Sequence, residues 1–295
     1  MNFESYIIEN DLGTIEKNYT FKELTTIGCG GRIGLLYAPN SISSLQKAFT
    51  YILEHELSYF LLGNGSNVLA RDEDYEGIVI HLRKIPYSYE IKDDILSCSA
   101  FYPTSKLAYD LAKEEWGDLS FLGGIPGLLG GAIYNNSGAY KDEIKNHLID
   151  VTYIDSAGKL ITISNKDCAF AYRKSIFHYI DGIIISARFK LKKMKTLEVL
   201  ERRAMARKLA QPLESRNMGS IFKNNPLIPA WKVIDALGMR GFHFHDAQVS
   251  SKHANFIINT GNAKSSEILN LIELIQRRAE LEFGMQLKYE ITIKK

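Results

Sequence analysis

Three glycine-rich clusters place the strongest constraint on how this chain folds. They lie at IGCGG (27–31), LGNGSN (62–67) and LGGIPGLLGGAIYNNSGAY (122–140). Glycine tolerates positive φ and lets main-chain N–H groups approach a ligand closely, so such stretches suit either turns between strands or cradles for phosphate groups. Turns are the commoner use of glycine. The clusters therefore predict loops at three places, and a ligand-binding role for them needs further support.

The second cluster does not follow the usual dinucleotide-binding pattern. A Rossmann fingerprint needs GxGxxG opening a helix directly after a strand, with an acidic residue about 20 positions further on. In LGNGSNVLARD the chain instead continues into the apolar residues Val68, Leu69 and Ala70. The P-loop ending GK[ST] is also absent from these clusters. A dinucleotide at this place would be held by loop amides between strands.

The composition indicates a globular protein of two or three units. The chain has 295 residues, of which 45% are hydrophobic, and its 36 Lys and Arg nearly balance 34 Asp and Glu. No overall charge would attract nucleic acid or anionic lipid. The three cysteines, Cys29, Cys98 and Cys168, form no CxxC pair, which argues against a zinc ribbon or a disulfide framework and fits a reducing cytoplasm.

We expect the chain to be cytoplasmic and to bind neither a membrane nor a nucleic acid. The segment MNFESYIIEN lacks the basic and apolar regions of a secretory signal. Apolar runs such as IDGIIISARF are far shorter than the roughly 20 residues of a membrane-spanning helix, and are typical of buried strands. The sequence leaves the oligomeric state open, with a monomer favoured.

Hydrophobic periodicity predicts an α+β fold. An amphipathic helix is expected after Pro39–Ser44, and another helix at 105–116. A polar-faced helix is expected within MKTLEVLERRAMARKLAQ, and a last helix, with one apolar face, within SSEILNLIELIQRRAELEFG, ending at Gly284. Short strands surround them, including a hairpin that turns at Asp155–Gly158 and a terminal strand LKYEITI. We divide the chain into 1–82, 83–194 and 195–295.

Ten segments, in register along nearly the whole chain, resemble the UDP-N-acetylenolpyruvoylglucosamine reductases, the MurB family, in the short subclass that lacks a substrate-covering tyrosine loop. These segments are TTIGCGG, LLGNGSNVLARD, GGIPGLLGGAIYNNSGAY, AYRKSIF, KLAQP, GSIFKNNP, PAWKVIDALGMRGF, QVSSKHANFIIN, NAKSSEI and LKYEI. The chain departs from the family in NNSGAYK, where MNAGAYG is more common, and this departure could alter contacts with the cofactor.

The resemblance implies an enzyme that uses FAD, with NADPH as co-substrate, to reduce the enolpyruvyl ether of a UDP-sugar in peptidoglycan synthesis. It implies an FAD-binding fold of the vanillyl-alcohol-oxidase type in two subdomains, 1–82 and 83–194. Residues 195–295 would form a third, substrate-binding domain, whose last strand carries Glu290 and could return toward the flavin. FAD would be held by Gly63, Asn64, Gly65, Ser66, Asn67, Gly124, Ile125, Pro126, Gly127, Gly130, Gly131, Ser137, Gly138, Ala139 and Ile183.

The same resemblance assigns the catalytic roles to Arg173, Ser220 and Glu290. A guanidinium stays charged and can grip a carboxylate with two parallel hydrogen bonds, so the arginine suits stabilisation of an enolate. Glu290 would assist, and Ser220 would give a proton to C2 of the substrate. The UDP-sugar would contact Tyr172, Lys208 and Asn224.

Each of these residues also has a simpler interpretation. Arg173 could form a structural ion pair, Ser220 could cap a loop, Glu290 could be an exposed strand residue, and Lys208 could belong to a solvated basic face. His243, His245 and His253 are close in sequence, but no cysteine or second carboxylate completes a ligand set, so we expect no metal site. Two alternative functions remain open: another FAD-dependent oxidase acting on a small hydroxy acid or alcohol, and a flavin- or nucleotide-binding module without catalysis.

Overall fold

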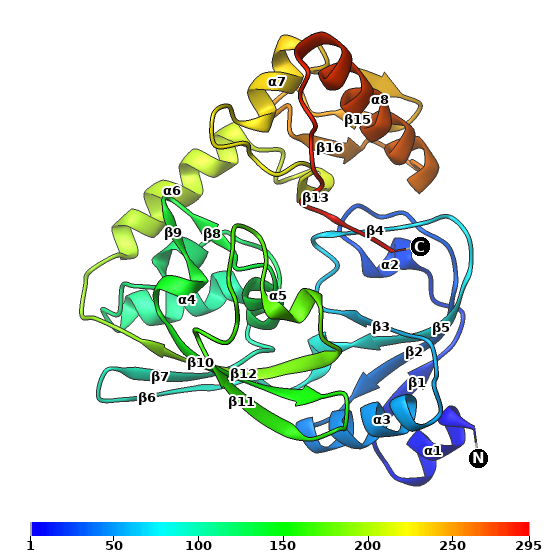
Figure 1. The fold of residues 1–295 in the computed structure, drawn as a ribbon, viewed down its shortest axis with the longest axis vertical. Helices are drawn as coiled ribbons and strands as arrows, with labels where there is room; N and C mark the ends of the chain where they lie inside the picture. Colours follow the sequence, from blue (N-terminus) through cyan, green and yellow to red (C-terminus); the bar gives the residue numbers. More distant parts are fainter. Residues whose placement is uncertain (1, 295) are drawn as a thin grey trace. The chain divides into compact units, whose positions relative to one another are not determined.

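The structure is a computed structural model that describes residues 2–294 (Figure 1). The chain divides into two compact units, each assembled from three stretches of sequence. The first unit comprises Met1–Lys17, Leu35–Gly63 and Gly77–Ala204, and the second comprises Asn18–Gly34, Asn64–Glu76 and Met205–Lys295. This division differs from our sequence boundaries, because residues 18–34 and 64–76 group with the C-terminal part. The division into three domains stays a prediction.

One sheet of the first unit lies near the N-terminus. In spatial order its strands are β1 (Gly13–Glu16), β2 (Ile33–Pro39), β5 (Tyr75–His81) and β3 (Tyr59–Leu62). The β1–β2 pair is antiparallel and the β3–β5 pair is parallel. Helix α1 (Phe3–Glu9) and helix α3 (Ile42–Glu54) belong to the same unit.

The predicted helix after Pro39–Ser44 is confirmed as α3. Its N-cap Ser41 accepts a hydrogen bond from the Ser44 N–H, which satisfies one of the donors left open at a helix start. The buried face follows the 3.6-residue period, with Leu45, Ala48, Phe49 and Ile52. These side chains join a hydrophobic cluster that also contains Tyr37, Ile78 and Ile80 from the sheet.

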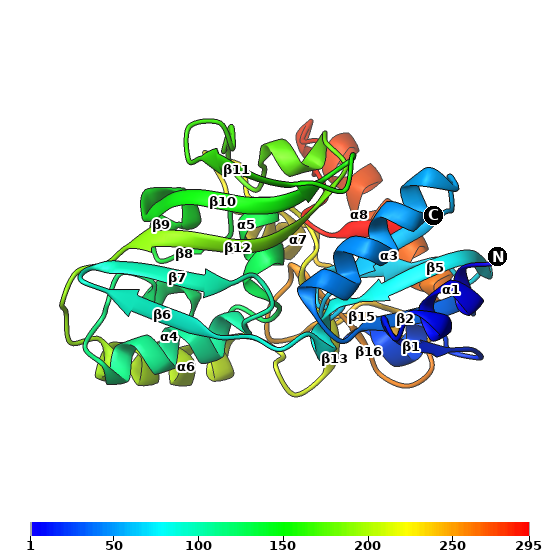
Figure 2. The ribbon, with the colours of Figure 1, turned by 90° about the horizontal axis from the view of Figure 1, so that it is seen from below.

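A second sheet of the first unit is fully antiparallel. In spatial order it consists of β11 (Leu160–Ser164), β10 (Leu148–Asp155), β12 (Gly182–Lys190), β7 (Ile95–Ser99) and β6 (Tyr89–Lys92), and both ribbon views show these strands side by side (Figures 1 and 2). The predicted hairpin turn at Asp155–Gly158 is confirmed, since Ile154 pairs with Leu160 and the Gly158 N–H donates to the Asp155 carbonyl at 3.0 Å.

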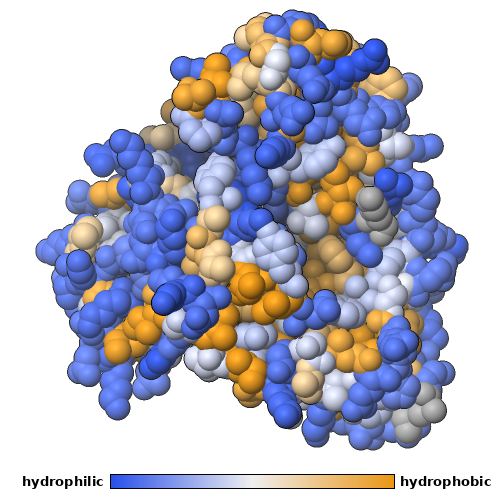
Figure 3. All heavy atoms as spheres, viewed as in Figure 1, coloured by the Kyte–Doolittle hydropathy of each residue, from blue (hydrophilic) through white to orange (hydrophobic). Residues whose placement is uncertain are grey.

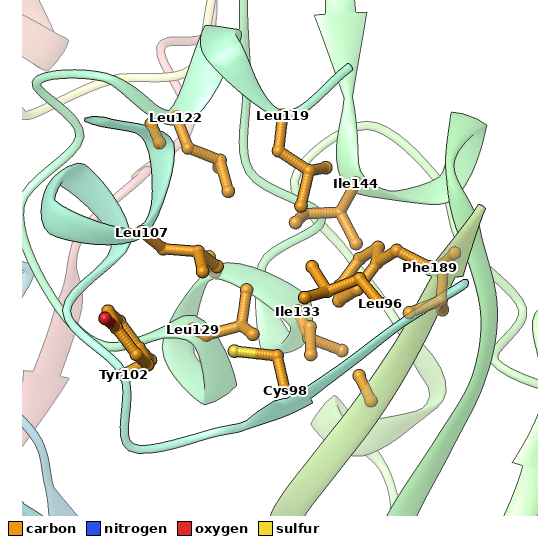
Figure 4. Close-up of a cluster of buried hydrophobic side chains, with 14 of the residues drawn as sticks. Leu96, Cys98, Tyr102, Leu107, Leu119, Leu122, Leu129, Ile133, Ile144 and Phe189 are labelled. Carbon is orange, nitrogen blue, oxygen red and sulfur yellow. The ribbon is translucent and has the colours of Figure 1, made fainter. Parts of the chain in front are cut away.

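The core beside this sheet is formed by the helices that follow β7. Side chains from α4 (Thr104–Lys113) and α5 (Leu129–Tyr134) meet those of the strands, as Figure 4 shows for Leu107, Leu129, Ile133, Leu96 and Phe189. The shorter elements of this unit are η1 (Leu82–Lys84), η2 (Ser120–Leu122), β8 (Gly138–Ala139), β9 (Asp142–Glu143), η3 (Ile144–Asn146) and η4 (Ile176–His178).

The second unit is built on an antiparallel sheet and a long helix. The sheet has β13 (Arg216–Ser220), β16 (Phe256–Asn259), β15 (Ala247–Val249) and β14 (His243–Phe244), and the helices are α2 (Phe21–Leu24), α7 (Ala230–Ala236) and α8 (Ser265–Phe283). Helix α6 (Leu197–Ala210) crosses the sequence boundary between the units. Helix α8 ends as predicted at Gly284, whose φ of +64° is the left-handed conformation that terminates many helices.

The expected strand LKYEITI is shorter than predicted. Only β17 (Thr292–Lys294) forms a strand, which pairs in parallel with β4 (Val68–Ala70) of the same unit. The preceding residues take other contacts, because the Lys288 carbonyl and the Glu290 N–H bond to the segment after β13. This early β4 strand, together with Ile27 and Cys29, completes the hydrophobic cluster of the second unit.

Over residues 2–294, no helix combines the length and the apolar composition that crossing a bilayer requires. On the face drawn in Figure 3, hydrophilic residues predominate and hydrophobic residues lie in patches among them. Scattered exposed apolar residues are normal on a folded protein.

Candidate functional site

The loop Asn64–Asn67, in the second unit, has the geometry of an anion cradle. Gly65 has φ of +61°. Within residues 2–294, the N–H groups of these four residues have no hydrogen-bond acceptor, and Asn64 Oδ1 is buried without a partner. Unpaired polar groups are costly to bury, so the open N–H donors suit a ligand that accepts several hydrogen bonds, as a pyrophosphate does, whereas Asn64 Oδ1 is an acceptor and needs a donor.

The loop is fixed from both sides while its N–H groups remain open. The Gly65 carbonyl accepts from the Thr26 N–H at 3.2 Å, and the Asn67 carbonyl accepts from the Thr292 N–H at 2.9 Å. Gly63, the preceding residue, belongs to the first unit and accepts a hydrogen bond from His81. Burial, with help from nearby Arg83 and Lys84, lowers the pKa of His81, so its imidazole is neutral at pH 7.

The other predicted FAD residues belong to the first unit, around helix α5. Gly124 and Gly127 have φ of +84° and +117°, and a Cβ added to Gly131 would meet nothing within 4 Å. Small residues with open space beside them allow a flat ligand to lie against the backbone. Ile183 differs from the rest, because its side chain is 1% exposed and packs in the core, so only its backbone is left for a cofactor.

Arg173 lies in a tight turn of the first unit. Ala171 and Lys174 bond to each other through both main-chain pairs, and Arg173 between them has φ of +53°. A non-glycine residue in this conformation costs roughly 1–2 kcal/mol, which the surrounding contacts must offset. The guanidinium donates to the Gly138 carbonyl at 3.0 Å and lies 5.0 Å from the centre of the Tyr172 ring. Arg173 is therefore held beside predicted cofactor residues.

Ser220 and Glu290 come together in the second unit. Ser220 ends β13 after Gly219, whose φ is +79°, and the pairing with β16 shifts register just before it. The Glu290 N–H donates to the carbonyl of Ile221, the residue after Ser220, at 2.8 Å. The Glu290 carbonyl accepts from Asn67 Nδ2 at 3.2 Å. The structure thus joins two predicted catalytic residues to the loop with open N–H groups.

The predicted substrate residues are more exposed. Tyr172 is 47% exposed, and Lys208 on α6 forms an ion pair with Glu214 at 3.3 Å between two exposed side chains. Such pairs are easily exchanged for another anion because water competes with them. Asn224 accepts a hydrogen bond from the Ala230 N–H at the start of α7, so part of its side chain serves the fold.

Sequence reasoning missed Asn136, which is fully buried at 0% exposure behind the turn that carries Arg173. Its only signal in the sequence was its place in the NNSGAY segment. For the three histidines, the described part of the chain contains no group of three His, Cys, Asp or Glu side chains placed to hold a metal ion.

Comparisons with known proteins show an FAD-binding oxidoreductase. Residues 34–164 match a family described as FAD binding domain, and residues 211–294 match the C-terminal domain of UDP-N-acetylenolpyruvoylglucosamine reductase. A reductase of that name from Protochlamydia amoebophila is 36% identical over 94% of this chain and 92% of its own length. One from Clostridium novyi is 35% identical over 96% and 93%.

A solved structure supports the same assignment. The UDP-N-acetylenolpyruvylglucosamine reductase (MurB) from Thermus caldophilus aligns with a TM-score of 0.79 at 30% sequence identity, covering 96% of this chain and 100% of that one. The chain belongs to the UDP-N-acetylenolpyruvoylglucosamine reductase family. It is an FAD-containing enzyme with the α+β fold that the sequence predicted.

Proposed function

We propose that Arg173, Ser220 and Glu290 carry out the reaction of this family, with the substrate held by Tyr172, Lys208 and Asn224. The reaction is the NADPH-dependent reduction of UDP-N-acetylglucosamine enolpyruvate to UDP-N-acetylmuramate in peptidoglycan synthesis. The residues of 63–67, 124–131 and 137–139 would hold FAD, which when bound would supply the hydride chemistry between NADPH and the enolpyruvyl group. The chain's own residues must then manage charge and protons.

Arg173 would stabilise the negative charge that hydride addition at C3 leaves on C2 and on the carboxylate. Its guanidinium cannot deprotonate at working pH and presents paired donors that match a carboxylate. One donor is bound to the Gly138 carbonyl. That bond aligns the group before the substrate arrives, and such preorganisation is what makes electrostatic stabilisation effective.

Ser220 would donate a proton to C2, with Glu290 beside it. A hydroxyl is a weak acid, but an enolate is a strong base, so the transfer is favourable when the two atoms are in hydrogen-bond reach. The observation that most supports this pairing is the 2.8 Å bond from the Glu290 N–H to the Ile221 carbonyl, which ties Glu290 to the residue after Ser220. Glu290 would assist by orienting the hydroxyl.

We also propose that the enzyme works in the cytoplasm as a monomer. The three cysteines are buried free thiols, which a reducing compartment preserves. Size-exclusion chromatography coupled to light scattering tests the monomer, and a dimer mass would contradict it.

The test of the catalytic proposal separates the two halves of the reaction. In Ser220→Ala, NADPH should still bleach the flavin at the normal rate, whereas reoxidation of the flavin by the enolpyruvyl sugar should slow by about 10²–10⁴-fold, the usual contribution of general acid catalysis. Ser215→Ala, in the same approach to β13, is the control and should keep both rates. If Ser220→Ala reoxidises its flavin normally with the sugar, the serine is not the proton donor.

A further inference from the structure

Helix α5 connects the predicted cofactor loop to the turn of Arg173. The helix begins at Leu129, next to the glycine-rich segment, and ends at Tyr134. Two bonds run from its C-terminal end to the arginine turn: Ser175 Oγ donates to the Tyr134 carbonyl at 2.6 Å, and Asn136 Nδ2 donates to the Ala171 carbonyl at 3.1 Å. The turn is therefore attached on both sides of Arg173.

Asn136 makes the larger share of these attachments. Besides Ala171, its Nδ2 donates to Glu143 Oε2 at 3.0 Å, and its Oδ1 accepts from the Lys145 N–H at 3.1 Å. The side chain is completely buried, and its φ of +42° is a conformation that asparagine adopts more readily than most residues. One amide thus links the end of α5, the segment 143–145 and the arginine turn.

The segment on the other side of Asn136 also reaches Arg173. Strand β9 pairs with β8, where Gly138 faces Glu143, and the Gly138 carbonyl accepts the hydrogen bond from the guanidinium. Asn136 therefore bonds directly to the turn, through Ala171, and to the segment that pairs with Gly138, through Glu143 and Lys145. A buried network in which every group is paired holds a unique arrangement.

We propose that Asn136 is a positioning residue for catalysis, which sets the place of the Arg173 guanidinium without touching substrate. This inference rests on the proposed role of Arg173. The site requires two donors, to a carbonyl and to a carboxylate, and one acceptor for an N–H. A side-chain amide supplies two N–H donors and an acceptor oxygen in one small group, whereas a hydroxyl has a single donor.

The test replaces only the donor half of the amide. Asn136→Asp keeps the size and an acceptor oxygen but loses both donor bonds, to the Ala171 carbonyl and to Glu143 Oε2, and it sets a second carboxyl group beside Glu143. We expect kcat with the enolpyruvyl sugar to fall by about 10- to 100-fold, the order of loss that a displacement near 1 Å causes, while flavin content and the KM for NADPH stay within about twofold. Asn165→Asp is the matched control, because Asn165 donates to the Lys145 and Leu148 carbonyls at 2.7 Å and has no bond to residues 171–173.

If both aspartate variants lose kcat equally, Asn136 only stabilises the segment and the inference is wrong. If Asn136→Asp does not fold, Asn136→Gly replaces it, since glycine accepts the positive φ and removes the whole side chain. A normal kcat in either folded variant also overturns the inference.

A double-mutant cycle separates this inference from the proposed function. Once Arg173→Lys has removed the paired donors, Asn136→Asp should lower kcat by less than twofold further, because residues that act through one another are not additive. If the two losses multiply while Arg173→Lys alone lowers kcat, Asn136 acts independently and only the positioning role fails. If Arg173→Lys leaves kcat unchanged, the role of Arg173 fails, and the role of Asn136 fails with it.

Discussion

Gly65→Ala should weaken FAD binding through a defined steric conflict. A Cβ added at Gly65 would lie 2.3 Å from the Leu24 carbonyl oxygen and 2.7 Å from the Thr25 Cα, both of them backbone atoms that a rotamer change cannot move. The φ of +61° adds a second penalty, because alanine rarely adopts the left-handed conformation. The loop must shift by about 1 Å to restore ordinary contact.

The size of the effect follows from these two terms. Left-handed backbone costs alanine roughly 1–2 kcal/mol, and overpacking of this kind costs roughly 1–3 kcal/mol. In the apoprotein the loop can relax, but binding a pyrophosphate on its N–H groups requires the original shape, so most of the cost falls on binding. A loss of about 3 kcal/mol corresponds to an increase in Kd on the order of 100-fold.

The assay is titration of the apoprotein with FAD, followed by quenching of the flavin fluorescence. Gly238→Ala is the control, because Gly238 has a similar φ of +66° but nothing within 4 Å of the added Cβ. It shares the backbone penalty and lacks the clash, so it should lower stability slightly and leave the Kd unchanged. An unaltered Kd in Gly65→Ala, or equal weakening in both variants, would refute the reasoning.

Two further predictions concern stability and reactivity. Asp72→Ala should lower the free energy of unfolding by about 1–2 kcal/mol at pH 7, because its carboxylate accepts the N–H groups of Ser265 and Ser266 at the start of α8. Burial raises the pKa of Asp72, but these hydrogen bonds outweigh burial and the net shift is downward, so the stabilisation is complete above pH 5 and is lost as pH falls through the lowered pKa. Urea unfolding of the wild type and the variant at pH 7 and near pH 3 measures this loss. An undiminished difference in unfolding free energy at the lower pH would contradict the prediction. Burial raises the pKa of Cys29 and Cys168 to about 12, so the native protein should react with a disulfide reagent at pH 8 far more slowly than the denatured protein does, as absorbance of the released thiolate will report.

Local sequence signals located individual helices and turns better than they located which strands pair with one another. The spacing of apolar residues and Gly284 located α8, and the Asp155–Gly158 turn located a hairpin, because each depends on neighbours a few residues away. LKYEITI read as one strand by propensity, yet the structure divides it: Tyr289 forms an isolated antiparallel bridge with Phe222, and the strand proper is Thr292–Lys294, which pairs with β4. Propensity says that a segment can be a strand, and tertiary contacts decide where it is one.

The candidate site shows the same limit. Arg173, Ser220 and Glu290 could be named only through resemblance, because each residue type alone has a more ordinary use on a protein surface or cap. Asn136 could not be predicted, since its role depends on three segments whose meeting is visible only in the fold. The open N–H groups of Asn64–Asn67 likewise need the structure, although the glycine in that loop indicated their purpose.

The second unit's construction from three separated stretches bears on how the protein is made in the cell. During translation, residues 18–34 and 64–76 leave the ribosome long before residues 205–295 exist, so the apolar side chains of Ile27 and Leu69 must wait for the core that buries them. During that interval the nascent chain exposes apolar surface of the kind that chaperones bind. For the same reason this unit cannot be excised or exchanged as one continuous gene fragment.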